Sequence, residues 1–249
     1  MCGFYSRAEL NTNEFKKFYS VEKIAASLLK PHFTIRPKST NVVVTRNSPN
    51  KAEEMVWFFH PGWSGLPLSR GVINVRIESL VEGKTYFNDA FLHRRCLIPA
   101  SSWIEWVELQ GVKIPYVFTL KSRQFFAFAG LWNEYTDTFG KTVKGYAIIT
   151  TTPNKIAKTI HNRQPAVLRE NDYNCWLDPQ ETDRKKLIDC LDVYPAEDMH
   201  IFPVARDLSD DKPEILLPID KEQLQEEVLS AKNKYRQKSK LSPGQERLV

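Results

Sequence analysis

Features that mark several classes of protein are missing from this sequence. No apolar run approaches the roughly 18 residues that a membrane-spanning helix requires, so we expect no membrane segment. The first residues hold no basic region followed by an apolar stretch, so we expect neither a secretion signal nor a lipid anchor on Cys2. The four cysteines form no C-x-x-C pair and the five histidines are scattered, so we expect no metal and no cofactor.

The bulk composition is typical of a soluble globular protein. Hydrophobic residues make up 42% and charged residues 26% of the 249 positions, and the net charge is +5. A basic excess of this size is compatible with nucleic-acid binding, but it is more often only a solvated surface. Cys96, Cys175 and Cys190 stand among apolar residues and are expected to be buried thiols. That favours a reducing compartment, either the cytoplasm and nucleoid of a bacterium or a nucleus.

Residue patterning predicts one mixed α+β domain with a β-rich centre. Apolar residues recur at helical spacing over residues 11–30, and Pro31 ends the pattern. We assign residues 1–220 to the domain and residues 221–249 to a C-terminal helix with a basic, disordered tail. Further strands are expected over 41–46, 55–59, 71–76, 115–120, 125–130, 146–151, 201–206 and 214–219, and further helices over 152–161, 171–177 and 181–192.

Cys2 becomes the N-terminal residue if Met1 is removed, as is usual when the second side chain is small. The free terminus then carries an amine and a thiol on one carbon skeleton, with reference pKa values of about 7.7–8.0 and about 8.5. Such a pair reacts with an aldehyde in two steps, because the amine forms an imine and the sulfur then closes a thiazolidine ring. The alternative is that Cys2 is an ordinary residue at a frayed terminus.

Polar residues interrupt the strand-like stretch over residues 73–78. Alternation predicts that Asn74, Arg76 and Glu78 share one face of a strand. A core-facing strand would group an amide, a guanidinium and a carboxylate only where they line a site. A strand surface that faces solvent fits the same pattern equally well.

Two titratable residues further along the chain are candidates for proton transfer. Glu105 lies close to two tryptophans, where burial would raise its pKa and suit it to acid–base work, although a glutamate in a surface turn is the alternative. His161 follows a predicted short helix and precedes Arg163, which suits a proton shuttle beside a bound phosphate. A lone histidine, however, is more often structural.

The aromatic stretch over residues 56–63 combines two environments. We expect Trp57 in the core. Trp63 follows a Pro-Gly turn and is expected at an exposed position, where it can stack on the bases of a single strand.

In this order, the stretches resemble the SRAP (SOS response-associated peptidase) domain family. The resemblance runs from Cys2 to about Ile219 and rests on five spaced motifs, which makes it highly specific. The motifs are Met1-Cys2-Gly3, Trp57 with Pro61 and Trp63, Ile73-Asn74-Val75-Arg76-Ile77-Glu78, Arg95-Cys96-Leu97-Ile98-Pro99-Ala100 with Glu105-Trp106, and Ile160-His161 with Arg163 and Pro165.

The resemblance implies a protein that recognises abasic sites in single-stranded DNA, especially near junctions with duplex. It implies a β-barrel-like core of antiparallel and mixed sheet surrounded by helices. Cys2 would attach to the abasic sugar as a thiazolidine, after autopeptidase removal of Met1, and the crosslink would shield the site. Lyase-type chemistry and reversal of the crosslink are implied as well. We expect a monomer.

The same resemblance assigns roles to the other motif residues. Asn74 would orient the Cys2 amine and the sugar, while Glu105 and His161 would open the sugar ring and move protons. Arg76 would hold a phosphate beside the abasic site, with help from Arg163. Together with Trp63, the two arginines form the expected DNA-binding set.

Three stretches of the chain depart from the family pattern without touching these groups. Family members usually carry Arg where this chain has Phe4, Ala where it has Val75, and Ala-Asp-Gly where it has Ala100-Ser101-Ser102. The departures therefore concern DNA affinity and loop shape.

Two other classes fit part of the pattern. Met-Cys-Gly also opens the amidotransferases that hydrolyse glutamine with an N-terminal cysteine, but no synthase domain follows here. A noncovalent reader of damaged single-stranded DNA would not need Cys2, Asn74, Glu105 and His161 together.

Overall fold

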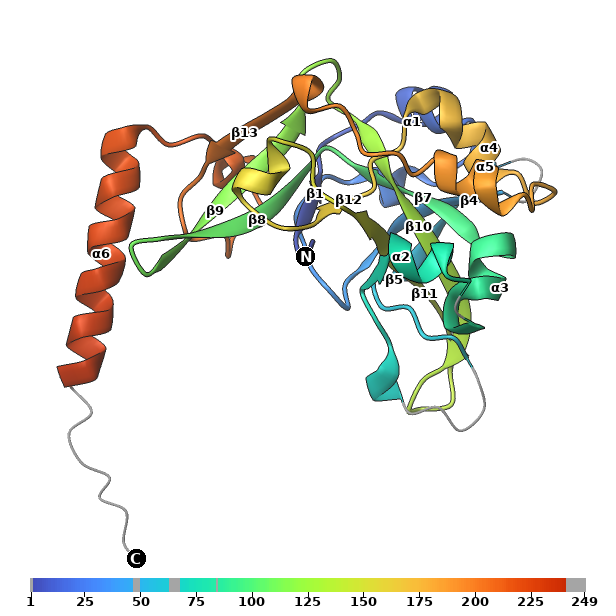
Figure 1. Cartoon of the computed structure of the whole chain (residues 1–249), viewed down its shortest axis with the longest axis horizontal. Coiled ribbons are helices and arrows are strands. Elements are labelled where there is room, and N and C mark those ends of the chain that lie inside the picture. The colour runs from blue at the N-terminus through green and yellow to red at the C-terminus, as the bar shows by residue number, and fades with distance from the viewer. Residues whose placement is uncertain (1, 47–49, 63–67, 84, 241–249) are drawn as a thin grey trace, which may run out of the picture.

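The computed structural model describes residues 2–46, 50–62, 68–83 and 85–240, and two β-sheets form its centre (Figure 1). The strands are β1 (Tyr5–Arg7), β2 (Val21–Lys23), β3 (His32–Ile35), β4 (Thr40–Arg46), β5 (Asn50–Val56), β6 (Asn74–Arg76), β7 (Arg95–Ala100), β8 (Ser102–Leu109), β9 (Val112–Leu120), β10 (Phe126–Thr136), β11 (Thr142–Thr151), β12 (Gln164–Pro165) and β13 (Met199–Pro203). One sheet has the order β13-β9-β8-β1-β3. The other has the order β12-β11-β10-β7-β4-β5-β2, with β6 paired to β11.

The helices surround these sheets unevenly. They are α1 (Thr12–Tyr19), α2 (Ile77–Val81), α3 (Thr85–His93), α4 (Tyr173–Leu177), α5 (Arg184–Asp189) and α6 (Lys221–Lys240). In Figure 1, α6 stands alone beside β9 at one end of the molecule, and the other helices gather at the opposite end. The predicted α+β class with a barrel-like sheet core is confirmed. None of the helices described is long and apolar enough to cross a membrane.

Near each end of the predicted domain, one predicted element is wrong. The helical pattern over 11–30 ends at Ser20, which adopts a left-handed backbone with φ 53° and closes α1; β2 and a 3-10 turn follow. An αL residue stops the hydrogen-bond ladder although the apolar spacing continues. The expected strand over 214–219 is instead a 3-10 helix over Pro213–Leu216. Proline at its start supplies a fixed φ that suits a helical turn.

Strand β1 is held in the middle of its sheet, between β8 and β3. Tyr5 pairs with Trp103 and Ser6 pairs with Ser102, and the Ile104 N–H donates to the Phe4 carbonyl at 2.9 Å. These ladder bonds continue almost to the N-terminus. They fix the backbone of the first residues, which would otherwise fray at a chain end.

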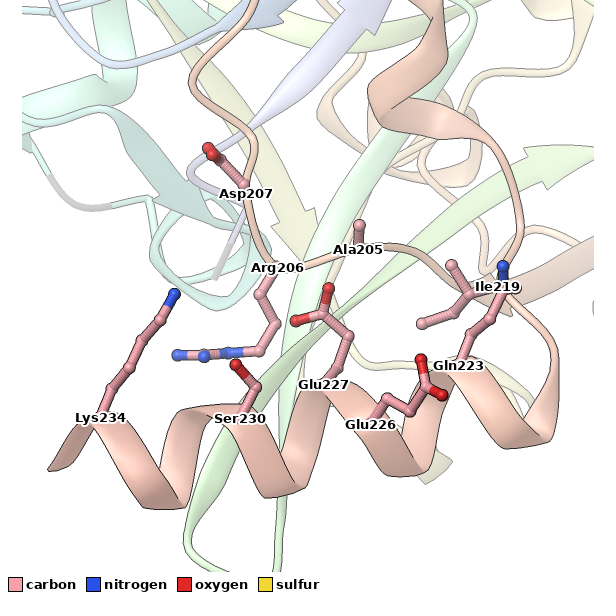
Figure 2. Close-up of a pocket in the computed structure, with 9 residues that line it drawn as sticks. All are labelled: Ala205, Arg206, Asp207, Ile219, Gln223, Glu226, Glu227, Ser230 and Lys234. Carbon is pink, nitrogen blue, oxygen red and sulfur yellow. The ribbon is translucent and has the colours of Figure 1, made fainter. Parts of the chain in front are cut away.

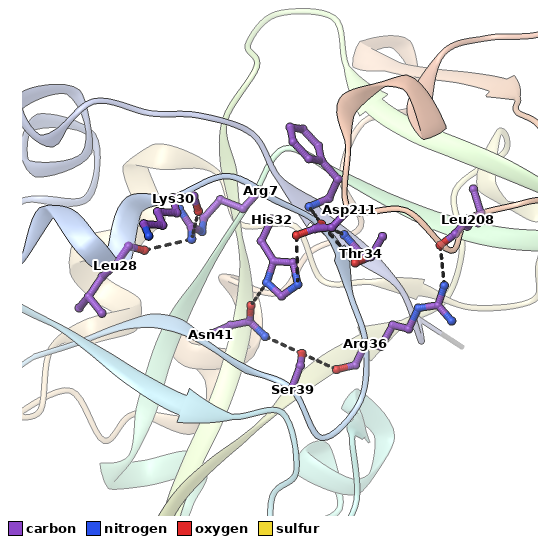
Figure 3. A network of polar contacts seen from close by, with 11 residues as sticks. Arg7, Leu28, Lys30, His32, Thr34, Arg36, Ser39, Asn41, Leu208 and Asp211 are labelled. Carbon is purple, nitrogen blue, oxygen red and sulfur yellow. Dashed lines mark hydrogen bonds and ion pairs between the residues drawn. The ribbon is translucent and has the colours of Figure 1, made fainter.

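Side-chain contacts fasten β1 and β3 to the rest of the fold (Figure 3). Arg7 donates to the carbonyls of Leu28 and Lys30 at 3.0 and 2.8 Å. Asp211 accepts hydrogen bonds from the backbone N–H groups of Phe33 and Thr34. The chain after β13 therefore contributes to holding the N-terminal strands in place.

The buried guanidinium of Arg95 joins β7 to the helical end of the molecule. Arg95 is 5% exposed. A planar guanidinium carries five N–H groups, so it can satisfy carbonyls from several elements at once. Its bonds go to the carbonyls of Phe91, Leu92, Trp176, Asp178 and Glu181.

We predict that Arg95→Lys destabilises the fold by at least about 2 kcal/mol, because an ammonium cannot reach all of these carbonyls and leaves buried acceptors unpaired. Urea unfolding at neutral pH measures the change. Arg206→Lys is the control, since Arg206 is exposed and makes one backbone contact. Equal stabilities of the two variants would contradict the structural role given to Arg95.

Candidate active site

Cys2 is fully buried at the start of the chain. Its thiol donates to the Phe4 carbonyl over 3.8 Å. Burial raises the pKa of the Cys2 thiol well above its usual range, and the nearby negative charge of Glu105 raises it further. The thiol is therefore protonated at neutral pH and needs a base before it can act as a nucleophile. The alternative of a frayed terminus is wrong for Cys2.

Asn74 contacts Cys2 directly. Strand β6 runs parallel to β11, with Asn74 opposite Ile148, and the Asn74 side-chain amide donates to the Cys2 carbonyl at 2.8 Å. The other end of the amide, Oδ1, is buried and accepts no hydrogen bond from any residue that the structure describes. A buried amide oxygen of this kind favours a donor such as an amine.

Glu105 lies on β8, next to the residue whose N–H binds the Phe4 carbonyl. It is 3% exposed, so the alternative of a surface turn is wrong. Burial raises the pKa of Glu105 from 4.5 to about 7. At neutral pH the carboxyl is divided between its protonated and ionised forms, which equips one residue to give and to take a proton.

His161 lies in a tight loop after a 3-10 turn over Ala157–Thr159, which replaces the predicted longer helix. The Asn154 N–H donates to the side-chain oxygen of Gln164 at 2.9 Å and closes this loop. The Arg163 N–H donates to Nδ1 of His161 at 3.0 Å, so Nε2 carries the proton of the neutral ring. Burial lowers the pKa of His161, which keeps the ring neutral at pH 7.

The two arginines expected to bind DNA differ in their surroundings. Arg76 ends β6 as an exposed residue. Arg163 is 11% exposed, and its guanidinium contacts Glu78 and the carbonyl of Thr150. Arg76 pairs in register with Thr150, so both arginines lie at the same end of β11. Their phosphate-binding roles remain predictions.

The alternation predicted over residues 73–78 is only partly right. Asn74 and Arg76 belong to β6, but the strand ends there, and Glu78 lies in the first turn of α2. The predicted site did not include Thr150, whose carbonyl binds Arg163, although Thr150 is a buried polar residue near the end of an apolar strand. Such a residue, placed where a strand ends, is a signal that sequence patterning can detect.

The structure therefore brings two predicted residues to Cys2 and connects the third to this group through Arg163. Asn74 contacts Cys2, and Glu105 acts on its thiol through charge. His161 connects to the same end of β11 through Arg163. Trp57 is buried in the core as predicted, whereas Trp63 lies outside the described residues.

The departures at Phe4 and at Ala100-Ser101-Ser102 have structural explanations. Phe4 is buried against Trp106, with the Arg36 guanidinium 4.9 Å from its ring centre. The hydroxyls of Ser101 and Ser102 each bind that of Ser6, at 3.1 and 2.6 Å. Phe4 and the two serines thus make side-chain contacts between the first residues of the chain and the segment 101–106.

No group of three or more histidine, cysteine, aspartate or glutamate side chains in the described ranges could hold a metal ion.

A surface cavity of about 720 Å³ lies away from Cys2, between α6 and the segment 205–207 (Figure 2). It is lined by both acidic and basic side chains, including Glu227 and Arg206, and contains none of the predicted residues.

Comparisons with known proteins show the family and the fold. The SOS response associated peptidase (SRAP) family model matches residues 1–210. The abasic site processing protein YoqW of Bacillus subtilis (strain 168) is 32% identical over 209 residues, which are 82% of this chain and 92% of that protein. The abasic site processing protein HMCES of Xenopus tropicalis is 24% identical over 206 residues, or 72% of this chain and 61% of that protein. A Bacteroides thetaiotaomicron structure shares the fold, with a TM-score of 0.78, 20% identity and coverage of 88% of this chain and 100% of that chain.

The raised pKa of Glu105 predicts how stability depends on pH. A carboxyl whose pKa is higher in the folded than in the unfolded state destabilises the fold as it ionises. The destabilisation is absent below pH 4.5, grows up to about pH 7 and is constant above. Glu105→Gln removes it, so the variant should gain about 1–3 kcal/mol over wild type between pH 5 and pH 8.

Urea unfolding of both proteins across that range measures the gain. Glu108→Gln, which changes an exposed carboxylate on the same strand, should follow the wild type. Parallel pH profiles for wild type and Glu105→Gln would contradict the raised pKa.

Proposed function

The chain belongs to the SOS response associated peptidase (SRAP) family, and we propose that it processes abasic sites in single-stranded DNA by covalent attachment through Cys2. One observation carries this proposal: a fully buried cysteine at the start of the chain has its carbonyl bound by Asn74 and its thiol beside Glu105. The names of the relatives supply the class of substrate.

The reaction begins with the release of Met1. Hydrolysis of the bond between Met1 and Cys2 adds one water and frees the Cys2 amine. The buried Oδ1 of Asn74, on the same amide that holds the Cys2 carbonyl, is a suitable acceptor for that amine. We therefore assign to Asn74 the orientation of the amine against the sugar.

Covalent attachment then needs several proton transfers. The closed sugar opens to an aldehyde when a proton leaves the C1′ hydroxyl and another reaches the ring oxygen. The amine adds to C1′, water leaves and an imine forms. The sulfur then adds to the same carbon, and its proton passes to the nitrogen of the thiazolidine. Glu105, with a pKa of about 7, is suited to both directions of proton transfer, and neutral His161 is suited to donate a hydrogen bond from Nε2.

The biological consequences follow from the chemistry. A thiazolidine at C1′ blocks the β-elimination that would otherwise cleave the strand, so the crosslink shields the lesion. Protonation of the thiazolidine reverses the attachment, and elimination from the imine gives lyase-type activity. We further propose that the protein acts as a monomer at junctions of single-stranded and duplex DNA, with Arg76 on a phosphate.

Variants at Cys2 should separate covalent processing from noncovalent reading. Wild type and an abasic oligonucleotide should give an adduct that resists heat and denaturant, and Cys2→Ala should give none. Both Cys2→Ala and Cys2→Ser keep the N-terminal amine and lack the thiol, so each should give only an imine, which borohydride traps. The tetrahydrofuran analogue of the abasic sugar cannot form an aldehyde and serves as the control. Equal adduct from wild type and Cys2→Ala on denaturing gels would refute attachment through Cys2.

DNA affinity should depend on salt, with a contribution from Arg76. Each phosphate contact on a single strand releases about 0.7 counterion, so Arg76→Ala should weaken binding and reduce the slope of log affinity against log salt by about that amount. Fluorescence anisotropy with the tetrahydrofuran oligonucleotide measures the slope without crosslinking. Arg206→Ala is a matched change at an arginine beside α6. A normal slope and normal affinity for Arg76→Ala would place Arg76 away from the DNA.

A further inference from the structure

The guanidinium of Arg163 is already engaged by the protein. Glu78 accepts two hydrogen bonds from it, from Nη1 at 2.6 Å and from Nη2 at 3.1 Å. Nη2 also donates to the carbonyl of Thr150 at 2.6 Å. Paired, charge-assisted bonds of this kind are geometrically specific as well as strong. These hydrogen bonds with Arg163 also hold the pKa of Glu78 below its usual range, so its carboxyl stays ionised at neutral pH.

Burial separates this pair from an ordinary surface ion pair. The side chain of Arg163 is 11% exposed and that of Glu78 is 48% exposed. The carboxylate thus covers the guanidinium from the solvent side. A DNA phosphate that sought Arg163 would have to displace Glu78, whereas Arg76 is exposed without any such rearrangement.

The backbone of Arg163 contacts Nδ1 of the His161 ring. Its N–H donates to Nδ1 at 3.0 Å, and its carbonyl lies 3.3 Å from the same nitrogen. The first contact suits the neutral ring with the proton on Nε2. The second suits a ring that carries a proton on Nδ1. A small shift of the Arg163 backbone would therefore change which nitrogen of His161 holds the proton.

The pair also bridges three elements. Glu78 belongs to α2, Thr150 ends β11, and Arg163 precedes β12. With its side chain fixed at α2 and β11, Arg163 cannot move its backbone independently of them. We propose that Glu78 is a positioning residue for the reaction: by holding Arg163, it keeps Nδ1 of His161 an acceptor and Nε2 protonated. Arg163 then anchors His161. The catalytic part of this proposal rests on the proposed function.

Glu78→Gln tests the proposal with three measurements. The tautomer of His161 in DNA-free protein, read from two-bond ¹H–¹⁵N couplings, should change from Nε2-protonated to a mixture. Single-turnover crosslinking should slow by about 10-fold or more, within the range that positioned proton transfer contributes. The salt slope of binding to the tetrahydrofuran oligonucleotide should stay that of wild type. Glu78→Asp, which keeps the charge on a shorter side chain, should restore part of the rate.

Glu170→Gln is the matched control. It removes the carboxylate from another Arg–Glu pair, with Arg123 at 3.4 Å, and should leave all three measurements unchanged. Thermal melting of each variant confirms that it is folded at the assay temperature. If Glu78→Gln does not fold, the tautomer of His161 is measured in Glu78→Asp and in Arg163→Lys instead. An unchanged tautomer in both of these variants overturns the proposal.

Two further results would overturn the proposal. Tighter DNA binding and a steeper salt slope in Glu78→Gln would mean that Glu78 only masks a phosphate site at Arg163. An unchanged tautomer and an unchanged rate would mean that the pair is only structural. Failure of the proposed function has a different signature, because wild type itself would then form no adduct while the tautomer of His161 still reports on Glu78.

Discussion

The hydrogen bond between the Ile104 N–H and the Phe4 carbonyl, at 2.9 Å, makes the remainder of the site possible. A chain terminus is normally solvated and mobile. Here the β-ladder extends to the first residues, and the buried hydroxyls of Ser6, Ser101 and Ser102 reinforce it. Cys2 is consequently held in a fixed and water-poor position, beside groups contributed by β6 and β8.

The same burial sets the protonation states of the reactive groups. It raises the pKa of Cys2 and of Glu105 and lowers that of His161, so each neutral form is favoured over the charged one. Water exclusion therefore keeps the thiol from reacting indiscriminately. It also raises the pKa of the Glu105 carboxyl to about 7, so that this group can act as acid or base near neutral pH. The ion pair of Glu78 and Arg163 contributes fixed geometry, and the lowered pKa of Glu78 keeps that carboxylate ionised in this range.

From the sequence alone, the residues that lie near Cys2 could be predicted better than the course of the chain around it. Glu105 beside two tryptophans was recognisable, because burial of a carboxylate among aromatics has a simple physical signature. The end of β6 at Arg76 was not, since alternation continues through Glu78 while the backbone turns helical. Likewise, apolar spacing after Tyr19 conceals the left-handed Ser20. The contacts of Arg163 with Glu78 and Thr150 join residues distant in sequence, and no local pattern reports them.

The intact mass of the protein tests the central claim most directly, before and after incubation with an abasic single-stranded oligonucleotide. We expect the purified protein to lack Met1. After incubation, a species should appear with the summed masses of protein and oligonucleotide less one water, because forming the imine expels one water and closing the ring expels none. Fragmentation should place the added mass on Cys2. A protein that retains Met1 and still forms the adduct, or one that lacks Met1 and forms none, would contradict the account.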